Sequence, residues 1–381
     1  MKRVIKIPLL LLILALVLVV VAVVVLVRAK KNAPPSLGST AISHDEQFGG
    51  VYINCTIEDF NKLGFSYGDS INITFSNGYS INDVPYYNGY YVDEGEVLLV
   101  AYPGYNYIKV GYNYGEDLWK VGNLSRTDRA SIVLNQKEKY LKNQQANDMQ
   151  YSNEQGNTPD EQFGNFRNVQ VGNLKENTLY RSASPIDNTI NRASVVDKLI
   201  KNVEIAYVVD LSDDYSKIES NLHTQSFNSP YFKSLYNSDK VIALSMNMQY
   251  KSNEFSTSLS TGLTSMAKNE GPYLIHCVEG KDRTGFVCMV LEALCGASYQ
   301  EIVDDYMLTY KNYYSITEEN NSDIYKIIKE RNIDNMLRYM CSLDKDANLS
   351  DVNYSEKAEE YLKSIGLNDY YISKLKTNLT N

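Results

Sequence analysis

Residues 276–285 read H-C-V-E-G-K-D-R-T-G, and this decapeptide decides more about the chain than any other stretch. Cys277 and Arg283 stand near its two ends, with Gly280 between them and Thr284 following. A cysteine that attacks a phosphate ester must be a thiolate and needs a cradle of donors and a cation for the phosphate oxygens. A glycine-bearing turn at a helix N-terminus supplies inward N–H groups, and a guanidinium supplies the cation.

The residues on either side predict a strand before the decapeptide and a helix after it. Residues 273–276 form a short apolar run of the buried-strand type. Apolar residues then recur at helical spacing over 286–294, and Gly296 is a typical helix stop. A nucleotide-binding phosphate loop is excluded, because Lys281 is followed by Asp282 where that motif needs Ser or Thr. A buried structural cysteine before a charged surface turn is the remaining alternative, and the full string in this setting disfavours it.

The decapeptide resembles the active-site signature of the cysteine-dependent protein phosphatases. It is most similar to the bacterial tyrosine-phosphatase group whose loop carries Gly-Lys-Asp-Arg-Thr-Gly and which often also accepts phosphoinositides. The resemblance covers about residues 160–377, with Asn168 and Ser212 replacing the group's usual Asp and Arg. The weaker matching segments, in chain order, are Asn165-Phe166-Arg167-Asn168, Leu179-Tyr180-Arg181-Ser182-Ala183, Val209-Asp210-Leu211-Ser212 and Glu301-Ile302-Val303-Asp304-Asp305-Tyr306.

The predicted site combines catalytic, substrate-binding and supporting residues. Cys277 is the expected nucleophile of a phosphocysteine intermediate, and Arg283 with the loop amides stabilises the transferred group. Thr284 is expected to hydrogen-bond the departing thiolate, and His276 to order the loop. The expected substrate-binding residues are Val278, Glu279, Gly280, Lys281, Asp210 and Arg181.

The proton donor to the leaving group is open among three aspartates. The chain has no Trp-Pro-Asp loop, and its single tryptophan, Trp119, lies far upstream. The resemblance implies Asp282, inside the loop, while Asp213 and Asp214 are competitors that could equally be ordinary solvated acids. Lys281 adds a second positive charge, which in the resembled group is associated with phosphoinositide headgroups.

The composition of the chain argues against some classes of binding partner. With a net charge of −9 and a pI near 5.1, the chain is not expected to bind nucleic acid. No cofactor or metal is expected, because the cysteines are scattered and lack C-x-x-C pairs, which argues against zinc and against a disulfide framework. The cysteines are Cys55, Cys277, Cys288, Cys295 and Cys341.

The N-terminus has the pattern of a membrane anchor. An apolar run from Ile7 to Val27 lies between basic flanks and is long enough to span a bilayer. We therefore expect a single-pass transmembrane anchor at 1–31, a stem at 32–44, and a catalytic domain on the extracytoplasmic side. The equal basic flanks, and the preference of a reduced thiol for the cytosol, leave the orientation open.

The rest of the chain divides into two predicted domains. Residues 45–141 have short strand candidates separated by turn signals and predict a small β domain. The Asn- and Gln-rich stretch 142–159 reads as a linker, and 160–381 as the phosphatase domain. The expected fold class is thus α/β: a mostly parallel, cysteine-phosphatase-like sheet with helices on both faces, after a small all-β domain and a transmembrane helix.

The sequence favours a membrane-anchored phosphomonoester phosphatase acting on phosphotyrosine or with dual specificity. A phosphoinositide or inositol-polyphosphate phosphatase is the alternative within the enzymes. Outside the enzymes, the chain could be a phospho-ligand-binding module or a surface scaffolding protein that acts mainly through its β domain.

Overall fold

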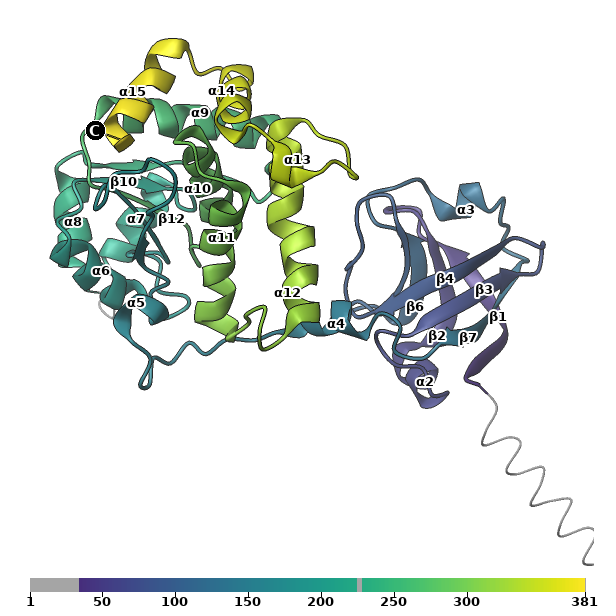
Figure 1. Ribbon diagram of the computed structural model, residues 1–381. Coiled ribbons are helices and arrows are strands. Elements are labelled where there is room, and N and C mark those ends of the chain that lie inside the picture. The colour runs from purple at the N-terminus through teal and green to yellow at the C-terminus, as the bar shows by residue number, and fades with distance from the viewer. Residues whose placement is uncertain (1–33, 225–227, 381) are drawn as a thin grey trace, which may run out of the picture. The chain divides into compact units, whose positions relative to one another are not determined.

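The computed structural model describes residues 34–224 and 228–380, and the chain forms two compact units, Met1–Asp148 and Met149–Asn381 (Figure 1). Each unit has a hydrophobic core of its own. The predicted anchor at 1–31 lies outside the described residues. The predicted linker at 142–159 contains most of a helix, α4, that belongs to the first unit. The predicted domain boundaries otherwise stay a prediction.

The first unit is a closed seven-stranded barrel in the order β1-β2-β6-β5-β4-β3-β7. Closure comes from β1, which pairs antiparallel with β2 on one side and with β7 on the other. Closing the sheet removes the unpaired edges that an open sheet would expose. The strands are β1 (Ser36–His44), β2 (Val51–Thr56), β3 (Ser70–Phe75), β4 (Ser80–Tyr87), β5 (Val97–Val100), β6 (Tyr107–Tyr112) and β7 (Arg129–Gln136).

Alternating apolar residues of these strands fill the barrel, as in β2, where Val51, Ile53 and Cys55 point inward. A buried ion pair joins Lys109 Nζ to Asp45 Oδ2 at 2.7 Å, with 3% and 8% of the side chains exposed. The helices of this unit are α2 (Ile57–Lys62), α3 (Leu118–Val121) and α4 (Leu141–Asp148).

The second unit contains a five-stranded sheet in the order β11-β10-β12-β9-β8. The pairs β11–β10, β10–β12 and β12–β9 are parallel, and β8 pairs with β9 antiparallel. The central strands are fully buried, which fits their continuous apolar sequences. The strands are β8 (Arg167–Asn168), β9 (Leu179–Ser182), β10 (Tyr207–Asp210), β11 (Val241–Ala243) and β12 (Tyr273–His276).

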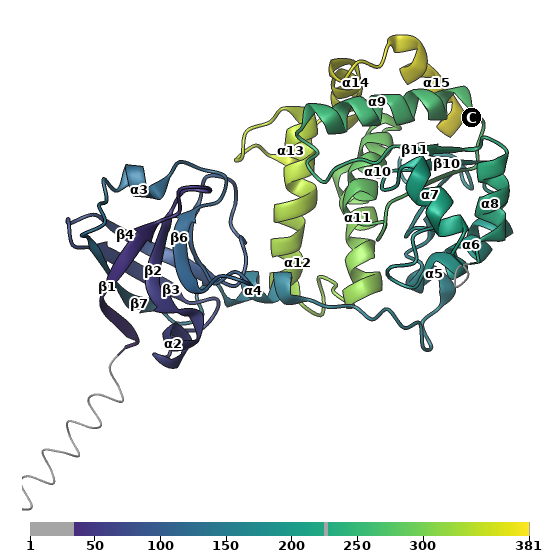
Figure 2. The same ribbon diagram turned by 180° about the vertical axis from the view of Figure 1, so that it is seen from behind.

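Helices surround this sheet, with α6 and α8 to one side and α10 and α11 to the other (Figures 1 and 2). A capping box of Ser298 and Glu301 begins α11, as its sequence predicts. The helices are α5 (Asp160–Phe163), α6 (Ala193–Asn202), α7 (Tyr215–Leu222), α8 (Pro230–Asn237), α9 (Asn253–Lys268), α10 (Asp282–Leu294), α11 (Tyr299–Tyr314), α12 (Ser322–Lys329), η1 (Glu330–Asp334), α13 (Asn335–Cys341), η2 (Leu349–Asp351), α14 (Tyr354–Ser364) and α15 (Asp369–Thr380).

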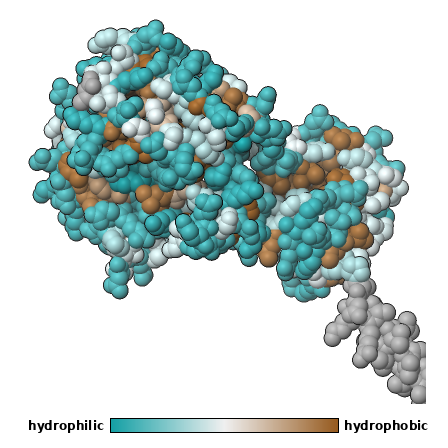
Figure 3. All heavy atoms as spheres, viewed as in Figure 1, coloured by the Kyte–Doolittle hydropathy of each residue, from teal (hydrophilic) through white to brown (hydrophobic). Residues whose placement is uncertain are grey.

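The fold class predicted from the sequence needs correction. Across residues 34–224 and 228–380, every helix is too short or too polar to cross a membrane. The first unit is a closed barrel, and the second is largely helical around strands of only two to four residues. The prediction rested on the alternation of strands and helices up to about residue 310, but the chain continues from Ser322 with helices alone. The visible surface is mainly hydrophilic with scattered apolar patches (Figure 3).

The buried pair in the barrel gives a first prediction. We expect Asp45→Asn to lower the free energy of unfolding of the barrel by about 3 kcal/mol, because Lys109 then stays buried without its counter-charge. Urea unfolding followed by the fluorescence of Trp119, the single tryptophan, measures this unit. Glu58→Gln in the exposed Lys62–Glu58 pair is the control and should not shift the transition. Equal midpoints for both variants would contradict the expectation.

Candidate active site

The decapeptide forms the turn between β12 and α10. β12 ends at His276, α10 begins at Asp282, and Cys277 lies between them with 3% of its surface exposed. Because β9, β10 and β12 are parallel, the turn lies at the carboxyl end of the sheet, where His276 is in register with Asp210 and Ser182. This is the end at which parallel sheets bind ligands.

The backbone carbonyls of the turn accept hydrogen bonds from four residues in three other segments of the chain. These bonds fix the carbonyls on the outer side of the turn. Within the described parts of the chain, the N–H groups of residues 278–283 donate to no protein acceptor. The donors are the Ser184 N–H to Val278 O (3.1 Å), Tyr313 Oη to Glu279 O (2.5 Å), and Arg181 Nη2 (3.1 Å) and Asn165 Nδ2 (3.2 Å) to Gly280 O.

Such a turn is an anion cradle. Its free N–H groups and the N-terminal end of the 13-residue helix α10 both favour negative charge at the turn. Gly280 makes the conformation possible, because its φ is +67° and a Cβ there would lie 2.2 Å from the carbonyl oxygen of Ser182. No side chain fits at this position without moving the backbone of β9 or of the turn.

A buried charge network supports the turn from outside. Asp305 on α11 is ion-paired with Arg181, and its Oδ1 lies 2.7 Å from Arg167 Nε. Burial opposes ionisation of Asp305, but the two arginines hold its pKa well below the usual range. The pKa of the nearby Glu292 carboxyl shifts in the opposite direction. Burial and the negative charge of Asp305 both raise it well above the usual value.

This network brings together three of the four weaker segments that resemble the phosphatase group. Asn165 and Arg167 come from the first segment, Arg181 from the second and Asp305 from the last, and all four contact one another or the turn. Arg181 is 1% exposed and bonds to the Gly280 carbonyl and to Asp305. These contacts tie Arg181 to the turn and to α11, and its predicted role in substrate binding stays a prediction.

Arg283 and Thr284 occupy the first turn of α10. Arg283 donates from Nη1 to the Met246 carbonyl at 2.9 Å, and its Nε has no partner among the described residues. Thr284 is fully buried, and its Oγ1 likewise has no partner in the described parts of the chain. Both side chains therefore retain donors that a bound anion or a thiolate could use.

His276 and Asp210 are fully buried side by side, with His276 Nε2 3.7 Å from Asp210 Oδ2. The other oxygen of Asp210 accepts from the backbone N–H groups of Ser212 and Asp213 at 2.9 and 3.1 Å. Burial raises the pKa of Asp210, and the charge of Asp213 adds to this, against the effect of His276. The side chain of Asp210 is fully buried at the end of β10, and its predicted role in substrate binding stays a prediction.

The three candidate proton donors have different surroundings. Asp213 is buried and ion-paired with Lys217 at 2.7 Å. Asp214 caps α7 by accepting from the Ser216 hydroxyl and the Lys217 N–H, which lower its pKa. Burial, reinforced by Glu279, raises the pKa of Asp282 despite nearby cations. Only the carboxyl of Asp282 combines a place in the turn with a pKa shifted toward the protonated form.

The mouth of the turn carries paired charges. Lys281 Nζ lies 3.0 Å from Glu279 Oε2 and 3.8 Å from Asp282 Oδ2. Burial opposes ionisation of Glu279, but Lys281 and a hydrogen bond from Tyr151 hold its pKa below the usual value. Lys281 is also 6.0 Å from the ring centre of Tyr314. The positive charge of Lys281 is therefore balanced by the neighbouring carboxyl groups of Glu279 and Asp282.

A row of tyrosines on α11 lies beside the turn and was not predicted from the sequence to be part of the site. Tyr306, Tyr310 and Tyr314 follow one another along α11, with ring centres 5.9 and 5.7 Å apart. Their spacing of four residues was the signal that could have found them, since such residues share one helix face. Tyr313, from the same helix, stacks on Tyr151 with centroids 4.8 Å apart.

Comparison with known proteins identifies the family. A family model described as the tyrosine phosphatase family matches residues 161–381. The chain belongs to the tyrosine phosphatase family. Membership supports a phosphatase, a hydrolase, as the function of this region.

No curated protein matches the chain. Among solved structures, it is similar to the crystal structure of an uncharacterized conserved protein from Thermotoga maritima, with 20% identity and a TM-score of 0.23. That likeness covers 25% of this chain, which spans only 35% of the other protein.

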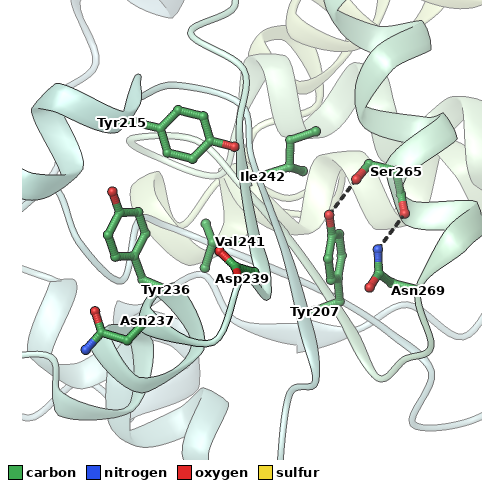
Figure 4. A pocket seen from close by; sticks show the side chains of 9 residues that line it. All are labelled: Tyr207, Tyr215, Tyr236, Asn237, Asp239, Val241, Ile242, Ser265 and Asn269. Carbon is green, nitrogen blue, oxygen red and sulfur yellow. Dashed lines mark hydrogen bonds between the residues drawn. The ribbon is translucent and has the colours of Figure 1, made fainter.

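A pocket of about 560 Å³ lies elsewhere in the second unit, where β10 and β11 begin (Figure 4). In it, Tyr207 and Ser265 share a hydrogen bond of 2.6 Å between their hydroxyls. Because Cys277 follows the opposite, carboxyl end of the sheet, this pocket does not belong to the phosphate-binding turn. Its lining residues are Tyr207, Tyr215, Tyr236, Asn237, Asp239, Val241, Ile242, Ser265 and Asn269.

The fit of Gly280 gives the second prediction. We expect Gly280→Ala to lower kcat/KM on p-nitrophenyl phosphate by about 100-fold or more, because its Cβ would displace the turn from Ser182. Gly156→Ala is the matched control: that glycine also has a positive φ, +53°, but open space around it. A steric role for Gly280 is wrong if both variants lose activity alike or if Gly280→Ala keeps wild-type kcat/KM.

Proposed function

We propose that residues 149–381 act as a protein-tyrosine phosphatase through a phosphocysteine intermediate. The observation that carries this proposal is the turn after Cys277, whose carbonyls accept hydrogen bonds while the N–H groups of 278–283 have no acceptor among the described residues. A dianionic phosphate needs such a set of donors, and a cysteine at its centre is the nucleophile that can use it.

In the first step, the Cys277 thiolate attacks phosphorus, an S–P bond forms and the P–O bond to the leaving group breaks. Arg283 and the turn amides stabilise the equatorial oxygens, because Arg283 is fixed through Met246 and still has free donors. Asp282 gives its proton to the leaving oxygen, a role supported by its raised pKa.

In the second step, water attacks phosphorus, the S–P bond breaks and Cys277 leaves as a thiolate. Asp282, now ionised, takes the proton from the water. The Thr284 hydroxyl donates to the departing sulfur, which its burial and its lack of another partner in the described residues support. Inorganic phosphate is released and the site returns to its starting state.

The depth of Cys277 below the surface and the aromatic side chains around the turn support phosphotyrosine as the substrate. Cys277 is only 3% exposed, so a phosphate at the end of a long phenyl group reaches it more easily than one on a short serine. The rings of Tyr310 and Tyr314 lie near the charged groups of Lys281 and Asp282. Aromatic side chains beside the turn suit a phenyl leaving group.

A phosphoinositide phosphatase remains the second candidate. Lys281 favours it, since an additional ammonium at the mouth could bind a further phosphate of an inositol ring. A panel of phosphotyrosine peptides, phosphoserine peptides and phosphoinositides, compared by kcat/KM, decides between them. A higher kcat/KM for phosphoinositides than for any peptide would overturn the tyrosine assignment.

The nucleophile gives the third prediction. We expect Cys277→Ser to abolish turnover of p-nitrophenyl phosphate, by at least about 1,000-fold, because the serine hydroxyl is not ionised at neutral pH. Acid-quenched wild-type enzyme should carry phosphate on Cys277, detected by mass spectrometry of its peptides. Cys288→Ser, in the buried core of α10, is the control and should keep its phosphatase activity. Unchanged turnover in Cys277→Ser would rule out the mechanism.

The proton donor gives the fourth prediction. Because the pKa of Asp282 is raised, its acid form persists to higher pH, and kcat should fall as pH rises through that pKa. Asp282→Asn should lower kcat about 100-fold for phenyl phosphate, a poor leaving group, and much less for an activated nitrophenyl ester. Asp214→Asn, which alters only the cap of α7, should leave this ratio and the pH profile unchanged. The assignment moves to another group if Asp282→Asn keeps the wild-type ratio.

A further inference from the structure

We propose that Tyr151 and Glu279 form a charge screen that neutralises Lys281 and biases the site toward singly phosphorylated substrates. The inference rests on the proposed phosphatase function and deepens it by naming what excludes multiply phosphorylated ligands. Tyr151 acts as a positioning residue, Glu279 carries the screening charge, and Lys281 is the cation that is screened.

The side chain of Arg192 holds Tyr151 and the two residues after it beside the turn. Arg192, 2% exposed, lies 4.9 Å from the ring centre of Tyr151 and 4.9 Å from that of Tyr313. Its Nη2 donates to the Ser152 carbonyl at 2.8 Å and its Nη1 to Asn153 Oδ1 at 3.3 Å. The segment 151–153 is therefore attached to the second unit through backbone, side-chain and ring contacts at once.

From this position Tyr151 fixes Glu279. Its hydroxyl donates to Glu279 Oε1 at 2.7 Å, while Glu279 Oε2 lies 3.0 Å from Lys281 Nζ. The Glu279 backbone carbonyl is taken by Tyr313 at 2.5 Å. Both carboxylate oxygens and the carbonyl thus have partners, so the carboxylate has one preferred position, against the ammonium of Lys281.

The pairing of Glu279 with Lys281 changes the charge that a bound substrate meets at the mouth of the turn. A free ammonium at the mouth would attract a second phosphate on the same substrate, whereas an ammonium paired at 3.0 Å with a carboxylate offers that phosphate little net charge. A single phosphoryl group is less affected, since it is bound by the turn amides and Arg283. Specificity arises here from a cancelled attraction rather than from an added contact.

The segment 151–153, which Arg192 holds in place, lies outside the part of the chain that matches the family. Tyr151, Ser152 and Asn153 precede residue 161, where the match begins, although they contact the turn or its supports. A sequence that reads as a polar linker thus contributes a side chain to the catalytic surface. A shortened chain beginning at 161 would lose the Tyr151 hydroxyl that positions Glu279 but keep every residue of the decapeptide.

The test compares two substrates in the full-length protein: a singly phosphorylated tyrosine peptide and inositol hexakisphosphate. For Glu279→Gln we expect the ratio of kcat/KM, inositol hexakisphosphate over peptide, to rise about tenfold. Tyr151→Phe keeps the ring but removes the hydroxyl, so the ratio should rise about threefold. Both gains should shrink in 0.5 M salt and disappear when Lys281→Met is added.

Tyr236→Phe is the matched control, because it removes a tyrosine–glutamate hydrogen bond of 3.2 Å, to Glu219, outside the turn. It should leave the ratio unchanged. The screen is refuted if Glu279→Gln and Tyr151→Phe keep the wild-type ratio, or if the gain survives Lys281→Met.

A binding arm separates this inference from the proposed function. The same two ligands are titrated by calorimetry into Cys277→Ser and into Cys277→Ser with Glu279→Gln. A tighter relative affinity for inositol hexakisphosphate in the second protein supports the screen even if no substrate is turned over. Turnover of aryl phosphate with an unchanged binding ratio refutes the screen and leaves the phosphatase proposal standing.

Discussion

The interaction on which the site depends is the buried pairing of Asp305 with Arg167 and Arg181. Burying three charges costs a large desolvation energy, and only close pairing with further hydrogen bonds offsets it. One of those further bonds runs from Arg181 to the Gly280 carbonyl. The charge network therefore does more than hold α11 to β9: it orients one carbonyl of the turn away from Cys277. Every backbone carbonyl turned outward leaves the neighbouring N–H groups free to face an anion.

The arginines and lysines around the turn differ in whether a carboxylate pairs with them. Arg167 and Arg181 are committed to Asp305, and Lys281 to Glu279. Among the described residues, the bond that Arg283 makes is to a neutral carbonyl, that of Met246. Most of the positive charge around the turn is thus paired with carboxylates, whereas Arg283 is the cation that the proposed mechanism assigns to the phosphoryl group.

The local parts of this arrangement could be predicted, and the long-range parts could not. The strand, turn and helix around Cys277 follow from adjacent residues, because hydrophobic spacing and helix stops act over short distances. The donor Asn165 lies more than a hundred residues from the carbonyl it holds, and Tyr151 equally far from Glu279. Barrel closure by β1 and β7 is of the same kind, since short strand signals do not reveal which edges meet. The apolar run at 7–27 lies outside the described residues.

Two carboxyl groups three positions apart in one turn show most clearly what the sequence leaves open. As residue types, Glu279 and Asp282 are nearly equivalent acids. Burial works against ionisation of both, but Glu279 gains Lys281 and the Tyr151 hydroxyl, which lower its pKa, while Asp282 has Glu279 as a like-charged neighbour, which helps raise its own. Environments that push two such pKa values apart assign different roles to the groups. The ionised Glu279 serves as a fixed counter-charge, and its negative charge is itself one reason that Asp282 can keep a proton to donate.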